Sequence, residues 1–230
     1  MGTSSERAGA FRPLGDEEGR EAVGTLEREY PDAEYYLSFR TPVDLLAAAI
    51  LSAQTRDEVV NSVTPELFRR FKTAKDYASA NPDDLVKYVG SVSFAGNKAK
   101  NIVNAFRIID EKYGGKVPDS MDALVELPGV GRKTANTILI NAYGIVEGIP
   151  VDTWVIKLSY RIGLSRSGEP GEIEKDLMRI VDRKHWKNIA YVMKAHGRKI
   201  CQSQVPRCSE CPLGPNGNGI CPRNGVGKSA

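Results

Sequence analysis

Apolar residues recur at helical spacing along most of this chain, and this periodicity constrains its fold more than any other feature. The pattern is clearest in residues 44–53, 59–71, 83–89, 97–115 and 120–127. Apolar positions three and four residues apart are typical of helices that bury one face. Convincing alternation of apolar and polar residues, which would indicate half-buried strands, is absent. The sequence therefore predicts an all-α fold.

Residues at the predicted helix ends support this assignment. Asn81 and either Asp119 or Ser120 stand where an N-cap is expected, since their side chains can accept a backbone hydrogen bond. Gly114 and Gly115 follow the segment 97–113 and predict its end. The last twenty residues are rich in Gly, Pro and Asn, so no helix is expected there.

Length and composition narrow the class of protein. The 230 residues suffice for one large domain or two small ones. No apolar run approaches the ~20 residues that a membrane helix needs, and the N-terminus lacks the apolar core of a signal peptide. We expect a cytoplasmic, nucleoid-associated protein, or a nuclear one in a cell with a nucleus. The net charge of +3 permits an anionic partner without requiring one, and residues 96–100 and 194–199 are locally basic.

A glycine-rich turn, Pro128-Gly129-Val130-Gly131, separates helical patterns at 120–127 and 133–143. The two glycines allow backbone conformations that are closed to other residues, and Val130 can fill the space between the helices. The free N–H groups and positive dipole end of the second helix would form an anion site suited to a DNA phosphate. The alternative is a tight corner between two helices that binds no ligand.

Two residues near this turn suggest chemistry. Lys133 lies in the first turn of the second helix, where the helix dipole disfavours a cation and should lower the lysine pKa. An amine with a lowered pKa is a better nucleophile. Asp152 lies past the end of that helix, where it is either a plain N-cap for the next helix or a carboxylate that faces a developing positive charge.

All four cysteines lie in the last 30 residues, which favours a local metal site over a disulfide scaffold. Cys201, Cys208, Cys211 and Cys221 are separated by six, two and nine residues. Four thiolates can bind zinc or an iron–sulfur cluster. The spacing alone does not decide between them.

Several of these motifs together resemble the endonuclease III family of base-excision DNA glycosylases. LPGVGRKTAN followed by VDT is similar to its helix-hairpin-helix and Gly/Pro–Asp signature, SAQTRD at 52–57 to an early motif, and HGRKIC with the later cysteines to its iron–sulfur segment. The resemblance extends from about Tyr36 to Cys221. It implies two helical lobes with a DNA cleft between them. One lobe would hold residues 36–145, and the other would join residues 1–35 to 146–230.

The resemblance also implies an activity. The chain would remove oxidised pyrimidines such as thymine glycol from double-stranded DNA and cleave abasic sites, acting as a monomer. Lys133 would attack the sugar C1′ and form a Schiff base, and Asp152 would stabilise the cationic sugar close to it. The implied DNA-binding residues are Gln54, Asp57, Phe94, Leu127, Gly129, Val130, Gly131, Arg132 and Thr153. The cysteines would hold a structural [4Fe–4S] cluster, beside which Arg198, Lys199 and Arg207 could face phosphates.

Three other functions compete with this one. A mismatch glycosylase of the same superfamily would lack the lysine found at position 133, and a non-catalytic helix-hairpin-helix module would need neither Asp152 nor SAQTRD. A regulator could use a zinc or iron–sulfur tail as a sensor. Trp154 and Lys157 depart from the commoner His and Arg of the family, so oxidised purines or uracil opposite guanine stay possible substrates. The resemblance makes Gln54 the residue that enters the gap left by the flipped base and Phe94 the wedge on the opposite side, but Phe94 could instead be a core aromatic.

Overall fold

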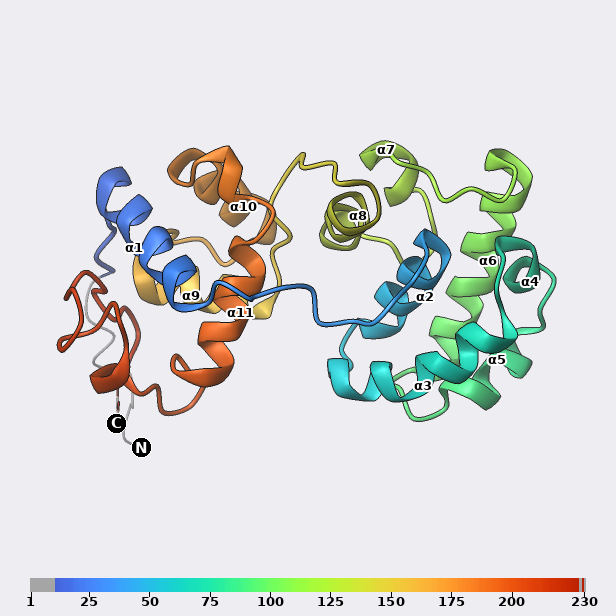
Figure 1. The fold of residues 1–230 in the computed structure, drawn as a ribbon, viewed down its shortest axis with the longest axis horizontal. Coiled ribbons are helices and arrows are strands. Elements are labelled where there is room, and N and C mark those ends of the chain that lie inside the picture. Colours follow the sequence, from blue (N-terminus) through green and yellow to red (C-terminus); the bar gives the residue numbers. More distant parts are fainter. Residues whose placement is uncertain (1–10, 228, 230) are drawn as a thin grey trace, which may run out of the picture. The chain divides into compact units, whose positions relative to one another are not determined.

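The computed structural model describes residues 11–227 and 229, and all regular elements in that part of the chain are helices. The all-α prediction is confirmed. The chain divides into two compact units (Figure 1). One unit runs from Tyr35 to Glu147, and the other takes the chain up to Glu34 and from Gly148 onward.

The unit of residues 35–147 is built around one long central helix. Its elements are α2 (Pro42–Ser52), α3 (Asp57–Arg70), α4 (Ala74–Ala78), α5 (Pro82–Val89), α6 (Ala95–Tyr113), α7 (Met121–Val125), α8 (Arg132–Ile138) and a π-helical turn (Leu139–Tyr143). α6 packs against α2, α4 and α5 (Figure 1). Its buried face includes Ile102, Ala105 and Ile109, as the helical spacing predicts, while Ile108 is only partly buried.

The predicted helix ends are mostly confirmed. Asn81 caps α5 by accepting a hydrogen bond from the Asp83 N–H at 3.0 Å, and α6 ends at Gly114 in the left-handed region. Ser120 occupies the N-cap position of α7, but its side chain makes no cap hydrogen bond. The helix predicted over 133–143 changes to π geometry at Leu139, which local spacing did not indicate.

The other unit contains α1 (Asp16–Glu29), α9 (Thr153–Ile162), α10 (Pro170–Ile180), α11 (Ile189–Lys199) and two short 3₁₀ turns, Arg183–His185 and Cys208–Glu210. α11 packs against α1 and α9. Where α9 meets α11, Gly197 lies so close to the ring of Trp154 that a β-carbon would overlap it. The described residues after Glu210 form turns and extended chain, as predicted from their composition.

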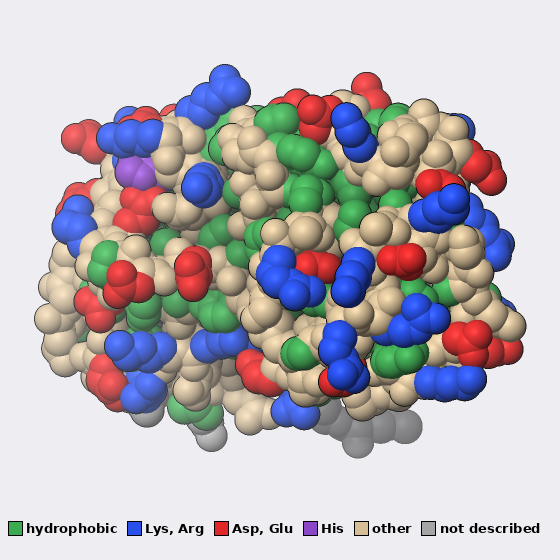
Figure 2. All heavy atoms as spheres, turned by 45° about the vertical axis from the view of Figure 1, so that its right-hand side comes forward, with side chains coloured by type: hydrophobic (Ala, Val, Ile, Leu, Met, Phe, Trp, Pro, Cys, Tyr) green, Lys and Arg blue, Asp and Glu red, His purple; other side chains and the backbone are tan. Residues whose placement is uncertain are grey.

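No helix within the described residues has both the length and the apolar character needed to cross a membrane. On the face shown in Figure 2, lysine and arginine side chains are interspersed with acidic ones. This mixed surface agrees with the small net charge of +3.

Candidate nucleic-acid interface and cysteine pocket

The turn between α7 and α8 is held by its apolar residues and by one glycine. Leu127 and Val130 are buried in the core, and the Val130 N–H donates to the Leu127 carbonyl at 3.0 Å. Gly129 has φ +82°, whereas Gly131 has φ −96°. The expectation that both glycines need special backbone conformations is therefore wrong for Gly131. Because Leu127 and Val130 are buried, only their backbone atoms could reach a phosphate.

In the first turn of α8, the first backbone N–H groups receive no cap hydrogen bond from the N-cap residue. Gly131 is the N-cap residue, and it has no side chain to accept from them. The first N–H groups of a helix have no partner within the helix. Arg132 in this turn is exposed and Lys133 is half-buried. This arrangement can receive an anion between backbone N–H groups and two cationic side chains.

Two loops of the same unit expose residues that were predicted to contact DNA. Gln54 is exposed after α2 and has φ 53°. Phe94 immediately precedes α6, has φ 58°, and is 65% exposed. The alternative that Phe94 is a core aromatic is therefore wrong. Asp57 is half-buried at the first position of α3.

The Lys98 side chain connects these two loops, and its burial was not predicted from the sequence. Its side chain is buried, with only 6% exposed, and burial lowers the lysine pKa. The Nζ group donates to the Leu51 carbonyl and to Thr55 Oγ1, both at 2.7 Å. The basic segment 96–100 is thus not uniformly a solvated surface. Its helical spacing to Ile102 and Ala105 places Lys98 on the buried face of α6, and that spacing could have indicated the burial.

Asp152 lies in the other unit, where it is the N-cap of α9. Its Oδ1 accepts hydrogen bonds from the Trp154 N–H at 2.8 Å and the Val155 N–H at 2.9 Å. The N-cap prediction is confirmed. The carboxylate is half-buried and Thr153 beside it is exposed. Both cap bonds use one oxygen of the carboxylate, so capping and an electrostatic role are compatible.

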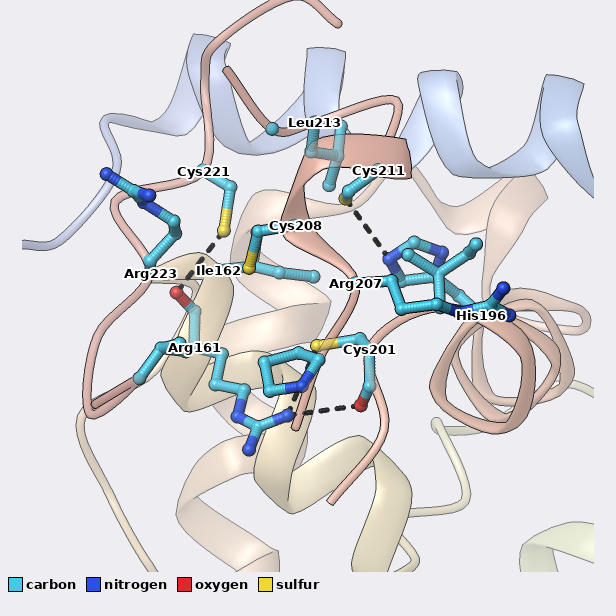
Figure 3. Close-up of a pocket in the computed structure, with 14 residues that line it drawn as sticks. Arg161, Ile162, His196, Cys201, Arg207, Cys208, Cys211, Leu213, Cys221 and Arg223 are labelled. Atoms are coloured by element: carbon cyan, nitrogen blue, oxygen red, sulfur yellow. Dashed lines mark hydrogen bonds between the residues drawn. The ribbon is translucent and has the colours of Figure 1, made fainter. Parts of the chain in front are cut away.

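The four cysteine sulfurs turn into one pocket (Figure 3). Cys208 is buried and the other three cysteines are partly buried. Apolar side chains, including Ile162 and Leu213, complete the lining. Burial raises the pKa of the Cys211 thiol to about 11 and that of the Cys221 thiol to about 12. Among the residues that the structure describes, no three His, Cys, Asp or Glu side chains are arranged to hold a single metal ion.

Two basic side chains contact the thiols. The Arg161 Nη1 group donates to Cys201 Sγ at 3.4 Å and also to the Cys201 and Gln202 carbonyls. His196 Nε2 lies 3.5 Å from Cys211 Sγ. Four thiols that line one pocket, with N–H donors nearby, form a donor set that fits an iron–sulfur cluster.

The nine residues between Cys211 and Cys221 fold back on themselves. The Asn218 N–H donates to the Pro212 carbonyl at 2.9 Å, and the Gly219 N–H donates to the Gly214 carbonyl at 3.0 Å. The Cys221 N–H then donates to the Leu213 carbonyl at 2.9 Å. This compact turn accommodates the long spacing and returns Cys221 to the pocket.

Arg207 also lines the pocket, and its guanidinium is engaged within the chain. Nη1 donates to Glu210 Oε2 at 3.0 Å, and Nη2 donates to the Lys199 carbonyl. The Lys199 ammonium lies over the Tyr30 ring, 5.8 Å from its centroid. These contacts hold the Arg207 and Lys199 side chains in place beside the pocket.

Comparisons with known proteins agree with this arrangement. A profile of the HhH-GPD superfamily of base excision DNA repair proteins matches residues 47–183. Endonuclease III of Synechocystis sp. is 45% identical over 188 residues, which cover 82% of this chain and 86% of that protein. Endonuclease III of Bacillus subtilis is 43% identical over 185 residues, covering 80% and 84%.

Solved structures give the same result. A trapped endonuclease III–DNA covalent intermediate matches with a TM-score of 0.86 and 37% identity, covering 92% of this chain and 97% of that one. A thermostable thymine-DNA glycosylase matches with a TM-score of 0.80 at 19% identity, which shows a shared fold.

Proposed function

This chain belongs to the endonuclease III family within the HhH-GPD superfamily, and we propose that it excises oxidised pyrimidines such as thymine glycol from double-stranded DNA through a Schiff base on Lys133. The chain is a base-excision-repair DNA glycosylase and abasic-site lyase. One observation carries the proposed nucleophile. Lys133 stands in the first turn of α8, directly after the glycine turn, in a chain whose 37%-identical relative was trapped covalently on DNA.

In the proposed reaction, the Lys133 amine bonds to C1′ of the damaged nucleotide as the C1′–N bond to the base breaks. The base leaves with the bonding electron pair and takes up a proton, and the amine loses one. Opening of the sugar ring gives a Schiff base, which makes the C2′ hydrogen acidic. Loss of that proton breaks the C3′–O bond on the 3′ side of the lesion. Water then releases the enzyme by hydrolysing the imine.

Asp152 has the complementary electrostatic role. Positive charge develops on the sugar as the base leaves, and a preorganised carboxylate stabilises it. The two N–H bonds to Oδ1 fix the orientation of this carboxylate.

The glycine turn and the two exposed loops would bind the DNA. The N–H groups at the start of α8, with Gly129 and Gly131 before them and Arg132 among them, would hold a phosphate without reading sequence. A base must leave the stack before its C1′ can be attacked. Gln54 is the residue that would enter the resulting gap, and Phe94 would insert as a wedge on the opposite side. Asp57 and Thr153 would lie near the base pocket and the sugar.

The four cysteines would hold a [4Fe–4S] cluster, because their thiols share one enclosed pocket. When bound, the cluster supplies no chemistry to base removal and stabilises the C-terminal tail. Arg198 and Lys199 would then be presented toward phosphates from α11. The enzyme would act as a monomer on nucleoid DNA.

Borohydride trapping tests the nucleophile. The substrate is a duplex that carries one thymine glycol, and the parent chain is compared with Lys133→Ala. We expect a covalent adduct with the parent and none with the variant. An abasic product without an adduct would instead indicate a monofunctional glycosylase. A second duplex that carries a pre-formed abasic site separates a wrong base specificity from a wrong nucleophile, because its reaction does not depend on the base.

A further inference from the structure

The two loops with exposed DNA-contact candidates meet at one half-buried hydroxyl, that of Thr55. Thr55, the residue after Gln54, accepts a hydrogen bond at Oγ1 from the Ser93 N–H at 3.2 Å, and Ser93 precedes Phe94. The same oxygen accepts from the Lys98 ammonium at 2.7 Å. A single side-chain oxygen therefore links the loop after α2 to the loop before α6.

Lys98 anchors this link to the body of the unit. Its ammonium also donates to the Leu51 carbonyl in the last turn of α2, at 2.7 Å. The last carbonyls of a helix have no partner within the helix and attract a cation. Lys98 itself lies one turn after Phe94, and its N–H donates to the Phe94 carbonyl at 3.1 Å. One residue thus contacts both loops and the helix from which the first loop leaves.

The backbone of both loops is strained. Three described residues other than glycine have a left-handed φ, and two of them are Gln54 and Phe94. Such conformations persist only where surrounding contacts impose them, and they concentrate at functional sites. The Lys98–Thr55 link supplies contacts of this kind at the residues adjacent to Gln54 and Phe94.

Stability alone does not explain why a lysine occupies this buried position. A buried cation loses its hydration, and an apolar side chain of similar shape would avoid that cost. Lys98 also lies in the first turn of α6, which is the unfavourable helix end for a cation.

We propose that Lys98 is a positioning residue for damage recognition. Through the Thr55 hydroxyl it holds the two loops so that Gln54 enters the gap of a flipped nucleotide and Phe94 inserts as a wedge on the opposite side. The inference rests on the proposed function, and it concerns the preference for damaged over undamaged DNA. Lys98 itself touches neither the sugar nor the base.

The test compares the parent with Lys98→Met, which keeps most of the length of the side chain and loses its charge, and with Thr55→Val, which loses only the hydroxyl. Asn81→Ala is the control, because it removes the N-cap of α5, at the end of that helix opposite to the one that leads into the Phe94 loop. The readout is the ratio of affinities for a duplex with a tetrahydrofuran abasic analogue and for the undamaged duplex. Thermal unfolding and borohydride trapping on a natural abasic site accompany it.

We expect Lys98→Met to reduce the affinity ratio about tenfold, since a few well-placed interface side chains carry most of the binding energy. Thr55→Val should also reduce the affinity ratio. If Lys98→Met does not fold, Thr55→Val is the variant that tests the inference. Asn81→Ala should lower the melting temperature and leave the ratio unchanged. A ratio equal to the parent's in the folded variants, or an equal loss in Asn81→Ala, would overturn the inference. If the parent forms no adduct, the proposed function fails first.

Discussion

Replacing Gly129 with alanine should destabilise the unit of residues 35–147, and the same change at Gly131 should destabilise it much less. Gly129 has φ +82°, and a β-carbon there would lie 3.1 Å from Asn101 Cβ and 3.2 Å from Ile50 Cγ2. At Gly131, φ is −96° and a β-carbon would meet no atom within 4 Å. Gly131→Ala is therefore a matched control for Gly129→Ala within the same turn.

The magnitude follows from two contributions. A left-handed backbone costs a residue with a β-carbon about 1–2 kcal/mol, and the tight contacts with Asn101 and Ile50 add about 1 kcal/mol. The free energy of unfolding should thus fall by roughly 2–3 kcal/mol in Gly129→Ala, combining these terms. A chain of this size loses about 2–4 °C in Tm per kcal/mol. Gly131→Ala should cost less than about 1 kcal/mol, because only the N-cap preference for glycine over alanine is lost.

Thermal and urea unfolding followed by circular dichroism measure both changes. Equal losses in the two variants, or a larger loss in Gly131→Ala, would refute the assignment of the strain to Gly129. Because Gly131→Ala retains its fold, its affinity for DNA then reports on phosphate binding by the turn separately from stability.

Three further changes have defined outcomes. The Tyr77 hydroxyl is buried without a hydrogen-bond partner, so Tyr77→Phe should raise the free energy of unfolding by about 1 kcal/mol in urea titrations; a loss would mean that the hydroxyl is satisfied. Gly197→Ala should destabilise by about 1–3 kcal/mol through overlap with Trp154, and Trp154→His should recover part of this in a double-mutant cycle. Cys221→Ser should lower the iron content and cluster absorbance of the purified protein; unchanged iron would exclude Cys221 as a ligand.

The helices and their boundaries could be predicted from the sequence, because they depend on residues that are close together in the chain. The helix ends at Asn81 and Gly114 follow from local hydrogen bonding and from the conformational freedom of glycine. The N-cap role of Asp152 follows from the same local chemistry. The π-helical turn at Leu139–Tyr143 could not be predicted, since nothing in its local spacing distinguishes it from an α-helix.

The candidate site was predictable only in part. Motif order indicated Lys133, Asp152 and the four cysteines, and the structure adds that the cysteines share one pocket despite the long last spacing. The exposure of Phe94 could not be decided from the sequence, because an aromatic residue beside a helix start can face either the core or the solvent.

By itself, the sequence determined the helical class, the glycine turn before α8 and the set of four thiols, because residue spacing and type carry this information. The tertiary structure alone decided which glycine of the turn is conformationally required, that Gly197 must lack a side chain beside Trp154, and that Lys98 is buried between two loops. These features depend on packing between segments far apart in the chain. A lysine in a basic stretch has the same local sequence whether it faces water or a carbonyl group of another helix.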